Sequence, residues 1–318
     1  MGKEIKRLNI LFLGGAKRVS IGRKIIEAGE KMGVDVRIYS YELSRLVPIA
    51  AIGEVIVGLK WSDSGLLEHL HSVVEEYRID ILVPFVDAAV GVAGVYTAKY
   101  NDAWAPVVDP AMAEVLFDKV SSASAFEEAE LDIPETYKGG RPVFPLIAKP
   151  RHGSASKGLI VINDIPEFRR IDKVRDEYIL QRYYPERQEY TVDCYINRNG
   201  EALCVSPRER LEVVNGEVSR TVTVDSPDVR DASLEAISRL KLTGAVTIQY
   251  LRDRSTGRLM LMEINPRLGG GVVCSVHAGA DIPRLILEEA LGIETEPIEE
   301  IKPDTLICRY FEETVFHV

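Results

Sequence analysis

The side chains best suited to chemistry lie near the C-terminus, in two β-type segments that flank a polar turn. Residues 246–251 and 259–265 alternate in character along the chain, and residues 253–257 between them read Asp-Arg-Ser-Thr-Gly. Gln249 and Glu263 stand equally far from the centre of this turn. In a regular hairpin they are therefore cross-strand neighbours.

Three oxygen-bearing side chains of this hairpin are candidate metal ligands. Because strand side chains alternate, Glu263 and Asn265 share one face of the second strand, while Met262 and Ile264 share the other. With Gln249 opposite Glu263, the polar face offers the oxygen ligands and the few carboxylates that magnesium prefers, leaving room for phosphate oxygens. The pattern predicts a site for Mg²⁺, with Mn²⁺ as an alternative ion. A solvated hairpin face is the other interpretation.

The residues after the second segment extend the same candidate site. Arg267 points to the polar face if the strand continues past Pro266, and its guanidinium could then bind a transferred phosphate through two hydrogen bonds. The run Leu268-Gly269-Gly270-Gly271 follows directly. Three glycines let the backbone approach a ligand closely, which favours a functional interpretation.

A second candidate site begins at a lysine that ends an apolar stretch, residues 143–148. Lys149 is well placed as a fixed cation, and the small residues after it could offer backbone N–H groups to phosphate. The order of residues does not match the Walker loop. From this segment alone, a flexible surface loop is an equally good interpretation. The candidate residues are Lys149, Gly153, Ser154, Ser156 and Gly158.

A third candidate segment, residues 178–183, is of strand type and is followed by Glu189. Its backbone could read an adenine edge, and the carboxylate could hold ribose hydroxyls, although an ordinary strand explains the segment as well. Arg210 and Arg220, in the strands before Gln249, are candidate contacts for a substrate or a phosphate. Surface arginines are an equally good account of both.

The first third of the chain predicts the elements that precede these candidates. Residues 8–13, 34–39 and 81–84 are strand-like, and residues 20–32 and 66–77 have the apolar spacing of helices. This alternation predicts an α/β unit with a doubly wound parallel sheet.

The turn at Gly14-Gly15 lacks the full G-x-G-x-x-G pattern of dinucleotide sites. A helix N-terminus after such a turn can hold an anion. The carboxylate or phosphate of a substrate is therefore a better expectation here than a nicotinamide cofactor.

The chain changes in character near residue 110. A helix is expected over residues 113–129, and long β-type segments follow, interrupted by helices near 232–240 and 283–291. The β-type segments are 178–184, 189–197, 202–206 and 218–224. This is α+β material, and we predict three units: residues 1–115, 116–185 and 186–318.

Composition narrows the class of protein. The chain has 318 residues and a net charge of −10, which argues against a general nucleic-acid surface. No segment approaches the length of a membrane span or the core of a signal peptide. The four cysteines show no metal-binding spacing. We therefore expect a cytoplasmic protein with reduced cysteines, and a homodimer is the default assembly.

In this order, the motifs resemble the ATP-grasp superfamily. Within it, the chain looks like a short, single-unit relative of one synthetase half of the carbamoyl-phosphate synthase large subunit. The resemblance rests on Asp118-Lys119, on Lys149-Pro150 with its Ser/Gly loop, on residues 181–189, on Gln249, and on the run 262–267 with its E-x-N-P-R motif. It implies an ATP-grasp domain of two parts behind a pre-ATP-grasp α/β domain.

The resemblance also implies roles for individual residues. The small unit would act as a lid over Mg-ATP. Lys119 and Lys149 would hold ATP phosphates under a loop formed by Gly153–Gly158. Leu180 and nearby backbone would contact adenine, and Glu189 would contact the ribose, with Gln181 and Tyr183 also among the nucleotide-binding residues. Gln249, Glu263 and Asn265 would hold magnesium. Arg267 would contact the transferred phosphoryl group, and Arg267, Lys149 and Asn265 are the expected catalytic residues.

The implied activity is that of a carboxylate–amine ligase. Such enzymes phosphorylate a carboxylate to an acyl phosphate, which an amine or another nucleophile attacks, so that ADP and phosphate are released. A kinase on the same scaffold and a non-catalytic ATP-binding subunit are the alternatives. The adenine segment reads Leu-Gln-Arg where relatives often have an acidic residue. With no second synthetase half or glutaminase part, the chain is not expected to make carbamoyl phosphate by itself.

Overall fold

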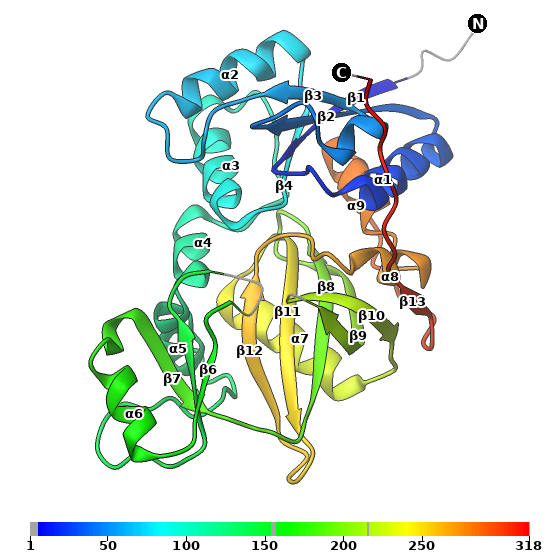
Figure 1. The fold of residues 1–318 in the computed structure, drawn as a ribbon. Helices are drawn as coiled ribbons and strands as arrows, with labels where there is room; N and C mark the ends of the chain where they lie inside the picture. Colours follow the sequence, from blue (N-terminus) through cyan, green and yellow to red (C-terminus); the bar gives the residue numbers. More distant parts are fainter. Residues whose placement is uncertain (1–5, 154–156, 215, 318) are drawn as a thin grey trace, which may run out of the picture.

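The N-terminal part of the fold is a parallel sheet covered on both faces (Figure 1). The computed structural model describes residues 6–153, 157–214 and 216–317. The sheet has the order β3-β2-β1-β4. Its strands are β1 (Lys6–Leu13), β2 (Val34–Glu42), β3 (Glu54–Val57) and β4 (Ile81–Pro84), accompanied by helices α1 (Val19–Met32), α2 (Leu66–Tyr77) and α3 (Asp87–Tyr100).

Strand β1 shows why this sheet is buried on both faces. Ile10 and Phe12 pack in a core with residues of α1, whereas Leu11 and Leu13 pack on the opposite face with residues of α2 and α3. A nearly continuous apolar run is typical of a parallel strand between two helical layers. The predicted doubly wound sheet is therefore confirmed.

The middle of the chain forms a small antiparallel sheet with the order β6-β5-β7. It is preceded by two helices, α4 (Pro110–Phe117) and α5 (Lys119–Glu128). Its elements are β5 (Leu146–Pro150), β6 (Ile160–Ile162), α6 (Ile165–Asp172) and β7 (Tyr178–Arg182). A small core of its own, with Leu146, Ile162 and Phe168, holds α6 against the sheet.

The single helix predicted over residues 113–129 is wrong, because the chain breaks at Asp118. This residue has extended backbone angles, φ −99° and ψ 115°, and its side chain accepts hydrogen bonds from the N–H groups of Val120 and Ser121. It is therefore the N-cap of α5. Apolar spacing continues through the break, so the periodicity alone did not show it.

The C-terminal part is a six-stranded antiparallel sheet with the order β12-β11-β8-β9-β10-β13. Its strands are β8 (Arg187–Ile196), β9 (Ala202–Val214), β10 (Glu217–Thr223), β11 (Gly244–Asp253), β12 (Leu259–Asn265) and β13 (Leu306–Cys308), and its helices are α7 (Pro227–Leu240), α8 (Val272–His277) and α9 (Ile282–Ala290). In Figure 1, α9 lies beside α1, in the N-terminal part of the fold.

Helix α9 joins the two large sheets into one core. Ile282 and Leu285 pack in the same buried cluster as Ile25 of α1 and Tyr195 of β8. Tyr195 also donates a hydrogen bond to Glu289 of α9, with 2.6 Å between the oxygens.

The strands of the three sheets fall within residues 6–84, 146–182 and 187–308. The boundary predicted near residue 115 falls inside α4, and the division into three units stays a prediction. None of the helices in the described part of the chain has the length and apolar character needed to cross a bilayer.

Candidate functional site

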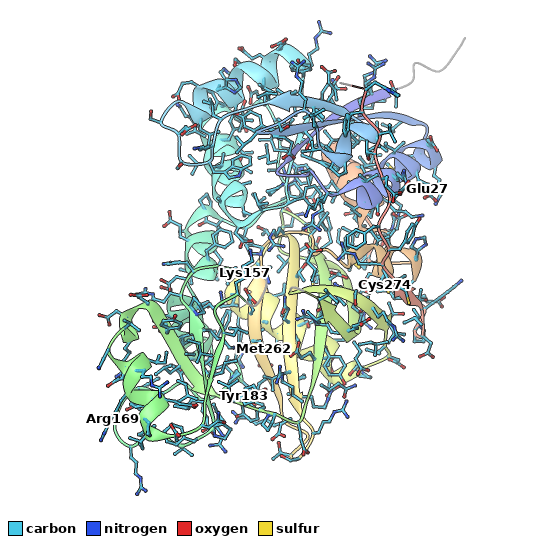
Figure 2. All side chains as sticks on the ribbon, viewed as in Figure 1. Glu27, Lys157, Arg169, Tyr183, Met262 and Cys274 are labelled. Atoms are coloured by element: carbon cyan, nitrogen blue, oxygen red, sulfur yellow. The ribbon has the colours of Figure 1, made fainter. Side chains whose placement is uncertain are left out.

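A pocket lies between the small sheet and the β11–β12 hairpin. Figure 2 shows Lys157, Tyr183 and Met262 along it, from three separate segments of the chain. Apolar side chains such as Ile147 and Leu261 line one part, and charged groups line another. Predicted site residues that the structure brings to this pocket are Lys119, Lys149, Gly153, Gln181, Tyr183, Glu189, Arg210, Gln249 and Glu263.

Lys149 lies inside the pocket near the end of β5. Its Nζ donates a hydrogen bond to Oε1 of Gln181 on the neighbouring strand β7, at 2.9 Å. Burial lowers the pKa of Lys149 to about 8, and the opposing effect of the Glu263 carboxylate does not offset this. An anion bound beside Lys149 would therefore stabilise the charged form of this lysine.

Lys119 is fixed at the start of α5 by the break described above. Its backbone N–H donates to the carbonyl of Arg151 at 3.0 Å, and its Nζ donates to the carbonyl of Gly153 at 2.7 Å. The Arg151 guanidinium pairs with Asp118, and this contact helps hold the pKa of that carboxyl below its usual value, against the effect of burial. The α5 N-cap and the segment after β5 are thus held together at one edge of the pocket.

Two of the predicted loop residues, Ser154 and Ser156, lie outside the described residues. Gly153 and Gly158 have positive φ angles, 112° and 74°. A Cβ on Gly158 would lie 3.0 Å from Cγ of Pro150, so this glycine packs against the end of β5 rather than lining the pocket.

The hairpin pairs Gln249 with Glu263, as predicted, but it is not regular. Tyr250 pairs with Leu261, so Met262 is an unpaired extra residue, a β-bulge. The bulge places Met262 and Glu263 side by side at the pocket, while Ile264 faces the core. Leu261 packs in that core and also borders the pocket. The expectation that Met262 shares a face with Ile264 is wrong for this reason.

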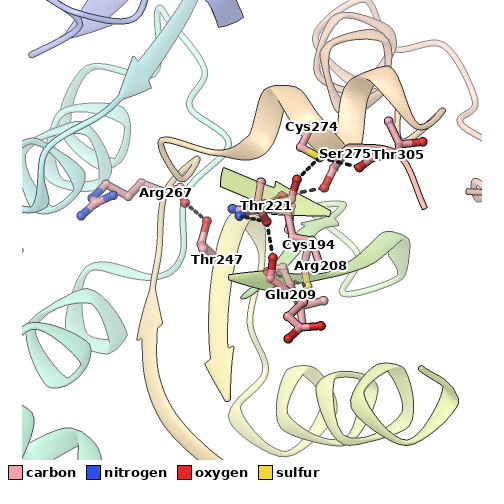
Figure 3. Close-up of polar contacts among 11 residues, drawn as sticks. Cys194, Arg208, Glu209, Thr221, Thr247, Arg267, Cys274, Ser275 and Thr305 are labelled. Atoms are coloured by element: carbon pink, nitrogen blue, oxygen red, sulfur yellow. Dashed lines mark hydrogen bonds and ion pairs between the residues drawn. The ribbon is translucent and has the colours of Figure 1, made fainter. Parts of the chain in front are cut away.

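Asn265 and Arg267 do not line this pocket. The strand ends at Asn265, which is only 8% exposed, and does not continue past Pro266. Nε of Arg267 lies 2.6 Å from the carboxylate of Asp87 at the start of α3, and its Nη2 lies 3.4 Å from Oδ1 of Asn265. Figure 3 shows Arg267 directed away from the sheet, with its carbonyl bonded to Thr247.

Glu189 lies in the pocket within a network of arginines. It accepts a hydrogen bond from Nε of Arg187 at 2.7 Å and lies 3.4 Å from Nη1 of Arg210. Arg210 also donates to Oε1 of Gln249, at 3.1 Å. Arg187, whose guanidinium lies over the ring of Tyr183, was not among the predicted residues.

Two further predicted contacts, Leu180 and Arg220, are not at the pocket. Leu180 is buried in the core of the small sheet, because alternation along β7 sends its side chain to the face opposite Ile179 and Gln181. Ile179 lines the pocket instead. Arg220 is exposed on β10, opposite Cys308 of β13, and the structure does not bring it to the site.

The run of three glycines packs mainly against protein groups. A Cβ on Gly269 would lie 3.0 Å from Oγ1 of Thr247, and a Cβ on Gly271 would lie 2.7 Å from Nη1 of Arg208. Arg208 is 2% exposed and bonded to Asp193, which also accepts from Ser275 (Figure 3). These glycines therefore allow the chain to cross a buried ion pair, a role that the sequence did not indicate.

The anion site expected at Gly14-Gly15 faces a protein carboxylate. Burial raises the pKa of Glu42, at the end of β2, and backbone N–H groups of Ala16 and Gly15 partly oppose this rise. A half-buried carboxyl already lies at this turn, which argues against a bound anion in the same place.

The comparisons with known proteins agree with this geometry. Residues 175–312 match the family model described as "ATP-grasp in the biosynthetic pathway with Ter operon". The carbamoyl phosphate synthase large chain of Bifidobacterium animalis subsp. lactis is 24% identical over 263 residues, which cover 72% of this chain and 23% of that protein. The chain thus spans about a quarter of the length of that relative.

Solved structures share the whole fold. The N5-carboxyaminoimidazole synthetase of Staphylococcus aureus, complexed with ADP, matches with a TM-score of 0.75 and 18% identity, covering 95% of this chain and 82% of that one. The biotin carboxylase domain of the Hydrogenobacter thermophilus 2-oxoglutarate carboxylase, in complex with MgADP, matches with a TM-score of 0.74 and 14% identity, covering 95% and 74%. At these identities the likeness shows the fold.

Proposed function

Since this chain has the ATP-grasp fold, we propose that it is a Mg-ATP-dependent ligase that activates a carboxylate as an acyl phosphate for attack by an amine or a similar nucleophile. One observation carries the proposal. The half-buried Lys149 and the Gln249–Glu263 pair line the same pocket, from two different sheets, and Glu263 exerts the largest opposing effect on the lowered pKa of Lys149. A cation for the phosphates and a carboxylate for the metal ion, facing one cavity, suit a nucleoside triphosphate.

The two parts of the pocket divide the binding of ATP between them. The apolar part, with Ile147, Ile179 and Leu261, offers surfaces for the adenine ring. Lys119 and Lys149 offer cations to the phosphates, and Arg187 and Arg210 hold Glu189 where it can meet ribose hydroxyls.

The residues at the hairpin fit a magnesium ion. Glu263 is half-buried, and among the residues that the structure describes its carboxylate has no hydrogen bond or ion pair. A cation bound beside this unpaired, half-buried carboxylate would stabilise its charged form. Magnesium typically takes one or two protein carboxylates and leaves other positions to phosphate oxygens, so Glu263 with the Gln249 amide oxygen would hold it, and Asn265 would support Arg267. Bound there, the ion would neutralise charge on the transferred phosphoryl group.

The proposed reaction asks the protein for positioning and charge neutralisation. A carboxylate oxygen attacks the γ-phosphorus of ATP, the bond to the bridging oxygen breaks, and ADP leaves. The nucleophile then attacks the acyl carbon, loses its proton and releases phosphate. Lys149 would hold the phosphate chain in line for this transfer. Arg267, at the end of the hairpin, would orient the reacting carboxylate.

The test is nucleotide chromatography after incubation with Mg-ATP and pooled carboxylic acids, amino acids and sugar acids. We expect ADP to form only with a substrate pool. Glu263→Gln should lower the rate at least 100-fold, while Glu299→Gln, an exposed glutamate far along the chain from the hairpin, should leave it unchanged. AMP as the product, or equal rates in both variants, would contradict the proposal. A stable phosphorylated product would identify the kinase alternative, and nucleotide binding without turnover in any pool would identify the binding subunit.

The expected partners are small molecules, a carboxylic acid and an amine. A homodimer and a cytoplasmic location stay predictions. Sedimentation of the purified chain at two concentrations would test the first, and fractionation of its host cells the second.

A further inference from the structure

Two arginines from distant segments, Arg18 and Arg309, meet at Gly270, and a third, Arg267, lies close enough to act on the charge of Arg18. Arg18 precedes α1, Arg267 follows β12, and Arg309 follows β13. A Cβ on Gly270 would lie 3.1 Å from Nη1 of Arg18 and 3.6 Å from Nη1 of Arg309. Burial is the largest effect on the pKa of Arg18 and lowers it; the Glu217 carboxylate raises it, and repulsion from Arg267 and Arg309 lowers it further. The absence of a side chain at Gly270 therefore leaves room for the guanidinium groups of Arg18 and Arg309.

The segment that carries Arg309 is held in place. After β13 the chain runs along α1 towards the N-terminal sheet (Figure 1). Arg23 of α1 makes two hydrogen bonds to the carboxylate of Glu312, at 2.8 and 2.9 Å, and Thr314 donates to the carbonyl of Pro48 at 3.3 Å. These contacts fix the end of the chain on the N-terminal unit and keep Arg309 beside Arg18.

The cluster has more positive than negative charge. Arg267 pairs with Asp87, and Arg309 pairs with Glu217 at 2.9 Å. Within the described parts of the chain, the half-buried side chain of Arg18 has neither an ion pair nor a hydrogen bond. Its guanidinium carbon lies over the ring of Phe85, 5.8 Å from the ring centre. Burial lowers the pKa of Arg18, and the nearby Glu217 carboxylate opposes this without offsetting it. The guanidinium thus stays charged without a hydrogen-bonded partner, and a bound anion would supply one.

Arg208 is a buried arginine with a purely structural role, and it provides a comparison for Arg18. It is more deeply buried than Arg18, but it bonds to Asp193 at 2.7 and 3.3 Å, and Asp193 is itself bonded to Ser275. A buried guanidinium is costly unless it is paired in this way. Arg18 departs from that pattern in the same region of the fold, which points to a ligand rather than to packing.

The cluster lies next to the nucleotide pocket but outside it. None of the three arginines lines the pocket. Arg267 touches Asn265, which follows Glu263 by two residues on β12, so the cluster begins where the proposed metal site ends. A molecule that reacts at the metal site and extends away from the nucleotide would reach Arg18 and Arg309.

We propose that the acid activated by this protein carries a second anionic group, a carboxylate or a phosphate, which Arg18 and Arg309 bind while the reacting carboxylate lies at Arg267. This inference rests on the proposed function and names its substrate class. The second anion supplies the partner that Arg18 lacks, and bidentate contacts from guanidinium groups suit both carboxylate and phosphate.

The test uses chain-matched acids: succinate and glutarate, butyrate as the acid with one carboxylate, and 3-phosphoglycerate as the phosphorylated acid. Hydroxylamine traps an acyl phosphate as a hydroxamate, so the natural nucleophile is not needed. Hydroxamate and ADP are measured for wild type, Arg18→Met, Arg18→Lys and Arg309→Met. Arg220→Met, exposed on β10, is the control. Calorimetric titration of each acid in the presence of Mg-ADP gives a readout that does not depend on turnover.

We expect at least one doubly anionic acid to exceed butyrate tenfold or more in kcat/KM or in affinity. Diacids and 3-phosphoglycerate then distinguish a carboxylate from a phosphate as the second group. Arg18→Met and Arg309→Met should each reduce that preference about tenfold through KM, Arg18→Lys should restore part of it, and Arg220→Met should match wild type.

The inference is overturned if wild type binds and uses butyrate as well as every doubly anionic acid, or if the methionine variants keep the preference. Mg-ATP affinity is measured in parallel with Lys149→Met. Loss of nucleotide binding in that variant, with intact binding in the Arg18 and Arg309 variants, separates the substrate class from the proposed function.

Discussion

Lys149 is charged in a position where burial opposes its charge. The protein offers it a neutral partner, Oε1 of Gln181, and a more distant carboxylate, Glu263. A bound phosphate would stabilise the charged form and raise its pKa. The affinity of the pocket for nucleotide is therefore expected to depend on the protonation of this one side chain.

The pH dependence of nucleotide binding tests this residue. Because the pKa of Lys149 is lowered to about 8 in the free protein, the lysine is mostly charged at pH 7 and mostly neutral at pH 9. The Kd for Mg-ATP should be nearly constant below about pH 7 and should rise by up to tenfold per pH unit above about pH 8, where binding must take up a proton.

Lys149→Arg keeps its charge over this range, so its Kd should lose the rise at high pH. Titration calorimetry at several pH values measures both profiles. A wild-type Kd that stays constant from pH 7 to pH 9.5 would refute this role of Lys149.

The sequence predicted residues whose properties are local. Lys149 ends an apolar strand, and the Gln249–Glu263 pair follows from counting around a turn. Arg18 could not be identified in this way, because its significance comes from Gly270 and Arg309, which are distant in the sequence. Leu180 was placed in the pocket by resemblance, whereas strand alternation, which is also local, assigns that position to Ile179.

At the scale of elements, the break between α4 and α5 positions a binding residue. Asp118 caps α5 and pairs with Arg151, and the N–H of Lys119 bonds to the carbonyl of that same arginine. One aspartate thus joins a helix start to the end of β5. The helix periodicity missed the break because the cap depends partly on a strand formed later in the chain.

Substitution of Asp118 should affect both stability and binding. Asp118→Ala loses the cap and the ion pair, and we expect unfolding to become easier by about 1–3 kcal/mol. Asp118→Asn keeps the capping oxygen and should lose less than about 1 kcal/mol. Both changes should weaken Mg-ATP binding, because Lys119 is less firmly held. Urea unfolding and titration calorimetry give the two values.

Asp109, the N-cap of α4, is the matched control. Its side chain accepts from the N–H of Ala111, but it does not line the pocket. Asp109→Ala should therefore lower stability by about 1 kcal/mol and leave the Kd for Mg-ATP unchanged. Equal effects of both caps on binding would show that Asp118 acts through stability alone.

At the scale of the whole molecule, the pocket lies between two sheets that have separate cores. Nucleotide bound there would contact β5 and β7 on one side and the β11–β12 hairpin on the other. The fold class could be predicted from the sequence because alternating strands and helices determine the parallel sheet. The way the C-terminal segment returns to α1 could not, since it depends on Arg23 meeting Glu312.

Mg-ADP should therefore stabilise the chain as a unit. At about 100 times its Kd, a ligand that binds only the folded state adds about 2.7 kcal/mol, which corresponds to a rise in Tm of roughly 5 °C for a chain of this size. Differential scanning fluorimetry measures the shift. Lys149→Met should abolish it, and Lys60→Met, at an exposed position, should retain it. A full shift in Lys149→Met would place the nucleotide elsewhere.

The bulge at Met262 has a consequence for how such a site can diverge. Because Tyr250 pairs with Leu261 and Gln249 with Glu263, removal of Met262 would close the ladder without moving either pair. A single-codon deletion there would leave the Gln249–Glu263 pair in register and remove one side chain from the wall of the pocket. The length of this strand can therefore alter the shape of the cavity independently of its charged groups, a route to new ligand preference that substitution alone does not provide.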